Sequence, residues 1–105
     1  MTKRQYKTPN KVRGSIFERN VRHRLEEIGF LVFRSAGSLG VDLIAISPNG
    51  KVYLIECKIS RKPRDFEIDK WSKIASQYGA HYLYVNRNNL YDVIKQLKTE
   101  LKTNS

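Results

Sequence analysis

The sequence lacks the features of a disulfide-bonded, secreted or membrane-embedded protein. It holds a single cysteine, Cys57, among 105 residues, which excludes an internal disulfide and a cysteine-based zinc site. No apolar run approaches the length of a membrane span, no apolar signal region follows the basic N-terminus, and low-complexity tracts and repeats are absent. We therefore expect an intracellular, cytoplasmic protein with one modest hydrophobic core and no membrane partner.

Positive charge, by contrast, is in excess. Lys and Arg number 20 against 10 Asp and Glu, so the formal net charge is +10. On so small a chain this charge is typical of a protein that binds a polyanion, with nucleic acid the first candidate. A basic surface kept for solubility is the plainer alternative, but the cations gather in two places. They are Lys3, Arg4, Lys7, Lys11 and Arg13 near the N-terminus, and Arg61, Lys62 and Arg64 further along.

The most informative stretch is a β-hairpin expected over residues 41–58. Two apolar, β-branched runs flank Pro48-Asn49-Gly50, which has the residues of a three-residue turn with glycine in the left-handed position. That turn predicts a register in which Ser47 pairs with Lys51, Ile44 with Leu54, and Asp42 with Glu56. Two carboxylates then face each other, with Lys58 on the same face and Cys57 on the opposite, core face.

Like charges directly opposite each other destabilise a sheet, so such a pair usually has a cation between its members. Hard divalent cations, Mg²⁺ above all, bind one or two carboxylates together with water and substrate phosphate. A lysine beside the ion can orient the attacking water or offset the charge that develops on phosphate. The alternative is a solvated sheet face, which is a poor explanation for three such residues inside otherwise apolar strands.

These residues resemble a known family. Asp42 followed by Glu56-Cys57-Lys58 resembles the signature of the PD-(D/E)xK nucleases, with Val41 where the motif often has proline; that proline is not a ligand. Further motifs resemble the archaeal-type Holliday junction resolvases: Arg13-Gly14-Ser15, Glu18-Arg19, Gly29-Phe30, Arg34-Ser35-Ala36-Gly37-Ser38 and Val41-Asp42. The resemblance runs from about residue 12 to residue 85.

The resemblance implies a structure-selective DNA endonuclease that resolves four-way junctions by paired, symmetric nicks. Asp42 and Glu56 would hold Mg²⁺, with Mn²⁺ as a substitute, Lys58 would act beside them, and Glu18 would be a further acidic residue of the site. Branched DNA would be the partner and a homodimer the assembly, because two symmetric cuts need two active centres. The side chains expected to contact DNA are Arg13, Arg19, Arg34, Ser35, Ser38, Arg61 and Lys62.

The remaining pattern predicts one nuclease domain over residues 12–101, with a flexible arm at 1–11 and a frayed tail at 102–105. Helical spacing of apolar residues predicts a helix from Ser15 to Gly29, where Ser15 and Glu18 have the form of a capping box. Glu18 therefore also has a purely structural explanation. Further elements are expected at 30–34, 69–78, 80–85 and 89–101. The order α-β-β-β-α-β-α gives an α/β fold, a mixed β-sheet flanked by helices with a restriction-endonuclease-like core.

Two rival functions remain open. The first is a restriction-type endonuclease that cuts duplex DNA with the same core, although the chain is short for an added base-reading module. The second is a non-catalytic DNA-binding protein, against which the intact set of Asp42, Glu56 and Lys58 argues. His23 and His81 are interpreted as structural, since neither has a catalytic partner nearby in the sequence, and Trp71 is expected to pack rather than to stack on a base.

Overall fold

The computed structural model describes residues 10–35, 40–59 and 63–103. The elements follow one another as α1 (Asn10–Glu27), β1 (Leu31–Arg34), β2 (Leu43–Ile46), β3 (Val52–Cys57), α2 (Asp65–Gln77), β4 (His81–Val85) and α3 (Leu90–Thr103). This is the predicted order of helices and strands. Within the described ranges, every helix is too short or too polar to cross a membrane.

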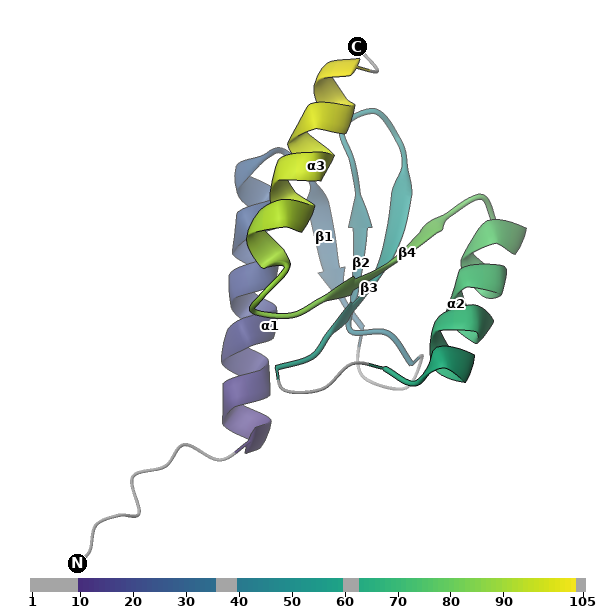
Figure 1. Cartoon of the computed structure of the whole chain (residues 1–105). Coiled ribbons are helices and arrows are strands. Elements are labelled where there is room, and N and C mark those ends of the chain that lie inside the picture. Colours follow the sequence, from purple (N-terminus) through teal and green to yellow (C-terminus); the bar gives the residue numbers. More distant parts are fainter. Residues whose placement is uncertain (1–9, 36–39, 60–62, 104–105) are drawn as a thin grey trace, which may run out of the picture.

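The four strands form one mixed sheet in the order β1-β2-β3-β4. β1 pairs with β2 and β2 with β3 in antiparallel fashion, whereas β3 and β4 run parallel. Parallel neighbours need a crossover connection, and α2 supplies it. In Figure 1, α1 and α3 lie side by side over the sheet, while α2 lies beside the edge strand β4 on the other side of the molecule.

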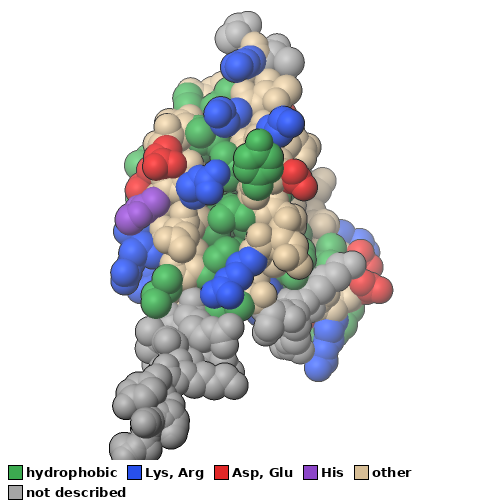
Figure 2. All heavy atoms as spheres, turned by 60° about the vertical axis from the view of Figure 1, so that its left-hand side comes forward, with side chains coloured by type: hydrophobic (Ala, Val, Ile, Leu, Met, Phe, Trp, Pro, Cys, Tyr) green, Lys and Arg blue, Asp and Glu red, His purple; other side chains and the backbone are tan. Residues whose placement is uncertain are grey.

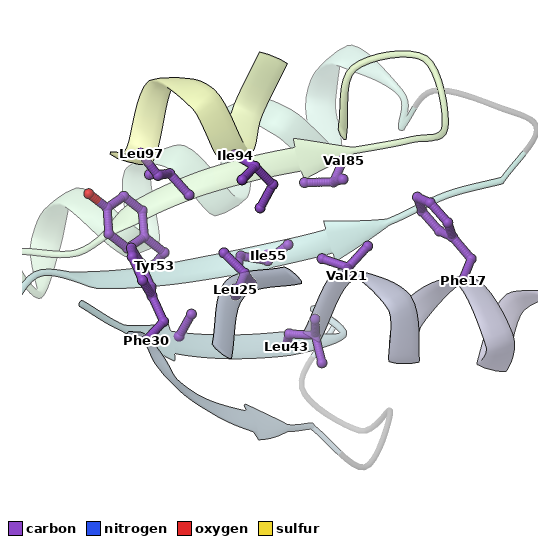
Figure 3. Close-up of a cluster of buried hydrophobic side chains, with 11 residues drawn as sticks. Phe17, Val21, Leu25, Phe30, Leu43, Tyr53, Ile55, Val85, Ile94 and Leu97 are labelled. Carbon is purple, nitrogen blue, oxygen red and sulfur yellow. The ribbon is translucent and has the colours of Figure 1, made fainter. Parts of the chain in front are cut away.

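The hydrophobic core lies between the sheet and the pair α1 and α3. Helical spacing places Phe17, Val21 and Leu25 on the buried stripe of α1, as the sequence predicted. These side chains point toward the sheet in Figure 3, where they meet residues of β2, β3, β4 and α3. The rest of the buried cluster comprises Phe30, Leu43, Ala45, Tyr53, Ile55, Val85, Ile94 and Leu97.

The opposite face of β1, β2 and β3 is also apolar but remains open to solvent. Because Phe33 pairs with Ile44 and Ile44 with Leu54, their side chains share this face. Phe33 is 50% exposed and Leu31 57%, which is unusual for such large apolar side chains. We call the set the apolar sheet face; its members are Leu31, Phe33, Ile44, Ile46, Val52 and Leu54.

The first predicted helix start is wrong. α1 begins at Asn10, so Ser15 lies inside the helix and cannot cap it, and residues 10 and 11 belong to the helix rather than to the arm. Gly14 lowers helix stability by roughly 1 kcal/mol relative to alanine but does not end a helix that packs through its apolar stripe. Residues 1–9 of the expected arm lie outside the described part of the chain.

The second helix also begins earlier than predicted, at Asp65 instead of Asp69. The Glu67 carboxylate accepts a hydrogen bond of 2.9 Å from the backbone N–H of Arg64, which satisfies a group at the helix start. The third helix follows Asn89 as predicted but continues to Thr103, so the tail boundary at 102 is too early by two residues. Residues 104 and 105 are not among those described.

Candidate active site

The hairpin between β2 and β3 has the predicted turn and register. Gly50 has a φ of +89°, and its N–H donates to the Ser47 carbonyl oxygen over 2.9 Å. The Ser47 N–H in turn donates to the Lys51 carbonyl oxygen over 2.8 Å, and Ile44 pairs with Leu54. Continued by two residues, this register sets Asp42 across from Glu56.

Asp42 is half-buried and held from both neighbouring strands. Its carbonyl oxygen accepts from the N–H of Ser35, and its own N–H donates to Ile55. Its carboxylate Oδ2 accepts a 2.7 Å hydrogen bond from the N–H of Cys57 on β3. Burial raises the pKa of Asp42 above its ordinary value and the nearby charge of Glu56 adds to the rise, while the Cys57 N–H opposes it.

Glu56 is a charged residue of the interior, with only 7% of its surface exposed. Both of its carboxylate oxygens have a donor. The hydroxyl of Tyr82 donates to Oε1 over 3.0 Å, and Lys58 Nζ lies 3.1 Å from Oε2. Buried carboxylates are tolerated only when they are paired in this way. The predicted juxtaposition of Asp42, Glu56 and Lys58 is thus present in the structure.

Glu18 reaches the same end of the sheet from α1. Its Oε1 lies 2.8 Å from Nε of Arg34, the last residue of β1, so one ion pair joins the helix to the strand. Burial raises the pKa of the Cys57 thiol, and the charges of Asp42, Glu18 and Glu56, in that order, raise it further. Three carboxylates therefore lie near this one residue of β3. Cys57 packs against the core, as its position on the strand predicted, but it is only partly buried.

A basic hollow adjoins these acidic residues. It has a volume of about 260 Å³ and is lined by Ser15, Glu18, Arg19, Arg22, Arg34 and Leu43. The structure thus brings together Arg19 and Arg34, two of the expected DNA contacts. Ser35 is adjacent to Arg34, and its buried hydroxyl oxygen finds no hydrogen-bond partner among the described residues. The Arg13 side chain, Ser38, Arg61 and Lys62 lie outside what is described, so their roles stay predictions.

Tyr82 is a residue of the site that sequence reasoning missed. The sequence showed that Tyr82 and Tyr84 share one face of β4, but nothing in it indicated which hydroxyl would meet Glu56. The parallel register places Tyr82 beside Leu54 and Tyr84 beside Glu56, yet the long tyrosine side chain carries the Tyr82 hydroxyl to Glu56. Burial raises the pKa of Tyr82, and the hydrogen bond to Glu56 raises it further, so the phenol remains a donor.

The donor set fits a hard divalent cation. Among the described residues no group of three or more His, Cys, Asp or Glu side chains stands ready to enclose a metal. What the site offers is two neighbouring oxygen ligands, Asp42 and Glu56, beside a basic surface. That is the arrangement with which Mg²⁺ is bound when water and substrate phosphate complete its coordination. His81 lies on the other face of the sheet, with its ring 5.3 Å from that of Tyr53.

The family model of the archaeal Holliday junction resolvases (Hjc) matches residues 9–76. The chain belongs to this family. The crossover junction endodeoxyribonuclease Hjc of Methanocaldococcus jannaschii is 42% identical over an alignment of 81 residues, and the match covers 72% of this chain and 60% of that relative. The chain therefore spans about three fifths of the length of this curated relative. The resemblance to Hjc proteins that the sequence motifs indicated is confirmed.

Solved structures show the same fold. A VRR_NUC domain superposes with a TM-score of 0.59 and 21% identity, over 78% of this chain and 94% of that one. Hjc of Archaeoglobus fulgidus superposes with a TM-score of 0.57 and 23% identity, over 71% of this chain and 66% of that one. At such identities the likeness concerns the fold alone. The predicted mixed sheet flanked by helices is the nuclease fold of these structures.

Proposed function

We propose that the protein is a metal-dependent endonuclease that resolves four-way DNA junctions by paired, symmetric nicks. The observation that carries the proposal is the cross-strand setting of Asp42 and Glu56, with Lys58 on the Glu56 carboxylate, in a chain of the Hjc family. A relative with 42% identity bears the name crossover junction endodeoxyribonuclease, which supports a branched DNA substrate.

The chemistry would be hydrolysis of a phosphodiester. Asp42 and Glu56 would hold Mg²⁺ or Mn²⁺, and the chemistry that such an ion would supply there is a water molecule of lowered pKa and a polarised scissile phosphate. Lys58 has its ammonium group on the Glu56 carboxylate, and from there it can turn toward that water to orient it or toward the phosphate to offset its charge. Glu18 is a third carboxylate, at the edge of the site, and forms an ion pair with Arg34.

The basic hollow would receive the DNA backbone. Arg19, Arg22 and Arg34 line it together, and a guanidinium binds phosphate through two parallel hydrogen bonds. Because the hollow shares Glu18 with the acidic cluster, a phosphate bound there would lie next to the one to be cut. Arg13, Ser38, Arg61 and Lys62 would extend this track.

The apolar sheet face would bind a second copy of the chain. A chain with a net charge of +10, whose Lys and Arg side chains are spread over the face shown in Figure 2, repels its own copies wherever its basic surfaces meet. The six residues that make up the apolar sheet face carry no charge, although the same face continues into Asp42 and Glu56. A two-fold contact pairs the same patch on both copies, which suits a flat apolar surface. The resulting homodimer would hold two active centres in fixed relation, as two symmetric nicks require.

The test is to incubate the purified protein with a four-way junction and with linear duplex of equal base count, with and without Mg²⁺. We expect symmetric nicks in opposing strands of the junction, only with metal. Asp42→Asn and Glu56→Gln should each abolish cutting but leave junction binding intact, since each removes one ligand charge at nearly constant volume. Lys58→Ala should abolish cutting and weaken binding slightly.

Each alternative has its own outcome. Equal cutting of duplex and junction would establish the restriction-type endonuclease instead. Junction binding without any metal-dependent cleavage would indicate a non-catalytic DNA-binding protein. If either Asp42→Asn or Glu56→Gln cut at the wild-type rate in saturating Mg²⁺, that residue would lose its role as a ligand.

A further inference from the structure

The Glu56 carboxylate is held by two donors of different kinds, one on each oxygen. Lys58 follows it on the same strand and is a charged, flexible donor whose side chain is one-third exposed. Tyr82 comes from the neighbouring strand β4 and is a neutral, half-buried donor on a rigid ring. The two bonds, of 3.1 Å and 3.0 Å, together fix the plane of the carboxylate.

We propose that Tyr82 is a positioning residue, which holds the Glu56 carboxylate in the orientation that binds the metal ion. The inference rests on the proposed function. Groups that hydrogen-bond to a metal ligand orient it and tune its affinity, and their loss typically weakens metal binding about 10- to 100-fold. Without such a bond, a glutamate side chain loses rotamer freedom each time it binds a metal ion, and this loss of entropy lowers its affinity for the metal.

Lys58 and Tyr82 have different roles in the proposed site. Lys58 is expected to act on the water or on the phosphate, and to do so its ammonium group has to leave the carboxylate. Tyr82 has no such second task, so its bond to Oε1 persists while Oε2 becomes available. A carboxylate oxygen has two lone pairs, so Oε1 can also take a further partner without losing the tyrosine. Tyr82 therefore keeps Glu56 in place at the moment when Lys58 moves away.

The neighbouring tyrosine provides a matched control. Tyr84 lies two residues further along β4 on the same face, and the register sets it directly beside Glu56. Its hydroxyl nevertheless accepts a 3.0 Å hydrogen bond from the Asn86 amide, and in the described part of the chain the tyrosine that donates to Glu56 is Tyr82. Tyr82→Phe and Tyr84→Phe thus delete the same atom from the same strand, and only one of them releases the carboxylate.

The experiment titrates Mn²⁺ alone into the DNA-free protein, followed by calorimetry, for the wild type and both variants. Tyr82→Phe should weaken Mn²⁺ binding by about tenfold, whereas Tyr84→Phe should bind as the wild type does. In nicking assays Tyr82→Phe should need correspondingly more Mg²⁺ for half-maximal rate and approach the wild-type rate at saturation. Its affinity for a four-way junction without metal should stay unchanged.

The outcomes separate the inference from the function on which it rests. A wild-type protein that neither binds Mn²⁺ nor nicks junctions would overturn the proposed function. A wild type that does both, with Tyr82→Phe equal to it in Mn²⁺ affinity, would overturn the role of Tyr82 alone. Equal weakening by Tyr82→Phe and Tyr84→Phe would also overturn it, since the effect would then belong to the packing of β4.

Discussion

Gly40→Ala tests whether Trp71 of α2 packs closely against the segment that leads through Asp42 into β2. Gly40 has a φ of +90°, and a Cβ atom added there would overlap Cζ2 of Trp71 on α2 and lie 3.0 Å from its Cε2. The left-handed backbone alone disfavours alanine by roughly 1–2 kcal/mol. Forcing a methyl group into an occupied space adds about 1–3 kcal/mol. Against a typical stability of roughly 5–15 kcal/mol, the combined loss is large.

Gly50→Ala separates the two contributions. Gly50 has nearly the same φ, +89°, but an added Cβ atom would meet nothing within 4 Å. Both variants therefore carry the backbone penalty, and only Gly40→Ala carries the contact with Trp71. Since about 1 kcal/mol shifts the melting temperature of a domain of this size by roughly 4–8 °C, the Tm of Gly40→Ala should lie well below that of Gly50→Ala. Thermal and urea unfolding followed by circular dichroism measures both.

A double-mutant cycle identifies the contact itself. In a Trp71→Leu background the benzo ring that blocks the Cβ atom is gone, so Gly40→Ala should then be no more destabilising than Gly50→Ala. A loss for Gly40→Ala equal to that for Gly50→Ala in the wild-type background would refute the reasoning. So would a full loss that persists in the Trp71→Leu background, because the strain would then have another source.

Three further predictions concern other parts of the fold. Burial and the Glu100 carboxylate raise the pKa of Tyr53 from 10.0 to about 12, so the folded state holds this proton more tightly than the unfolded state does. The contribution of Tyr53 to the free energy of unfolding should be fully present below pH 10.0 and should be lost as the pH rises through about 12. Tyr53→Phe should reduce this loss, as measured by urea midpoints. Because burial raises the pKa of Cys57, alkylation by iodoacetamide should be at least about tenfold slower in the folded than in the urea-unfolded protein, as followed by mass spectrometry. If the proposed homodimer forms through the apolar sheet face, Phe33→Asp should give a folded monomer in sedimentation analysis. Tyr91→Asp, a change at a 66% exposed residue of α3, should leave the proposed homodimer intact. A Phe33→Asp dimer would exclude the apolar sheet face as the contact.

The hairpin was predictable because its information is local. Pro48, Asn49 and Gly50 determine the turn, the turn determines the register, and the register places Asp42 opposite Glu56. Each step depends on residues within one short stretch of chain. The alternation of side chains then assigns Lys58 and Cys57 to opposite faces without any knowledge of the rest of the fold.

The donors that complete the site could not be found in this way. Tyr82 reaches Glu56 because β4 pairs in parallel with β3, and the register of a parallel pair is set by the packing of the crossover helix rather than by a turn. The ion pair between Glu18 and Arg34 likewise depends on how α1 packs against β1. The early start of α1 was missed for the opposite reason, since Ser15 and Glu18 match a local capping pattern that the longer helix overrides.

The local nature of the hairpin has a consequence for folding. Asp42 and Glu56 are separated by 14 positions and meet through antiparallel pairing, so only a short loop has to close before they face each other. Hairpins form within about 1–10 μs, whereas the parallel pairing of β4 has to await the long connection through α2. The two carboxylates should therefore face each other early, before Tyr82 arrives to hold Glu56. During that interval a divalent cation in the refolding medium would relieve their repulsion, and we expect Mg²⁺ to accelerate refolding of the wild type but not of Asp42→Asn in stopped-flow measurements.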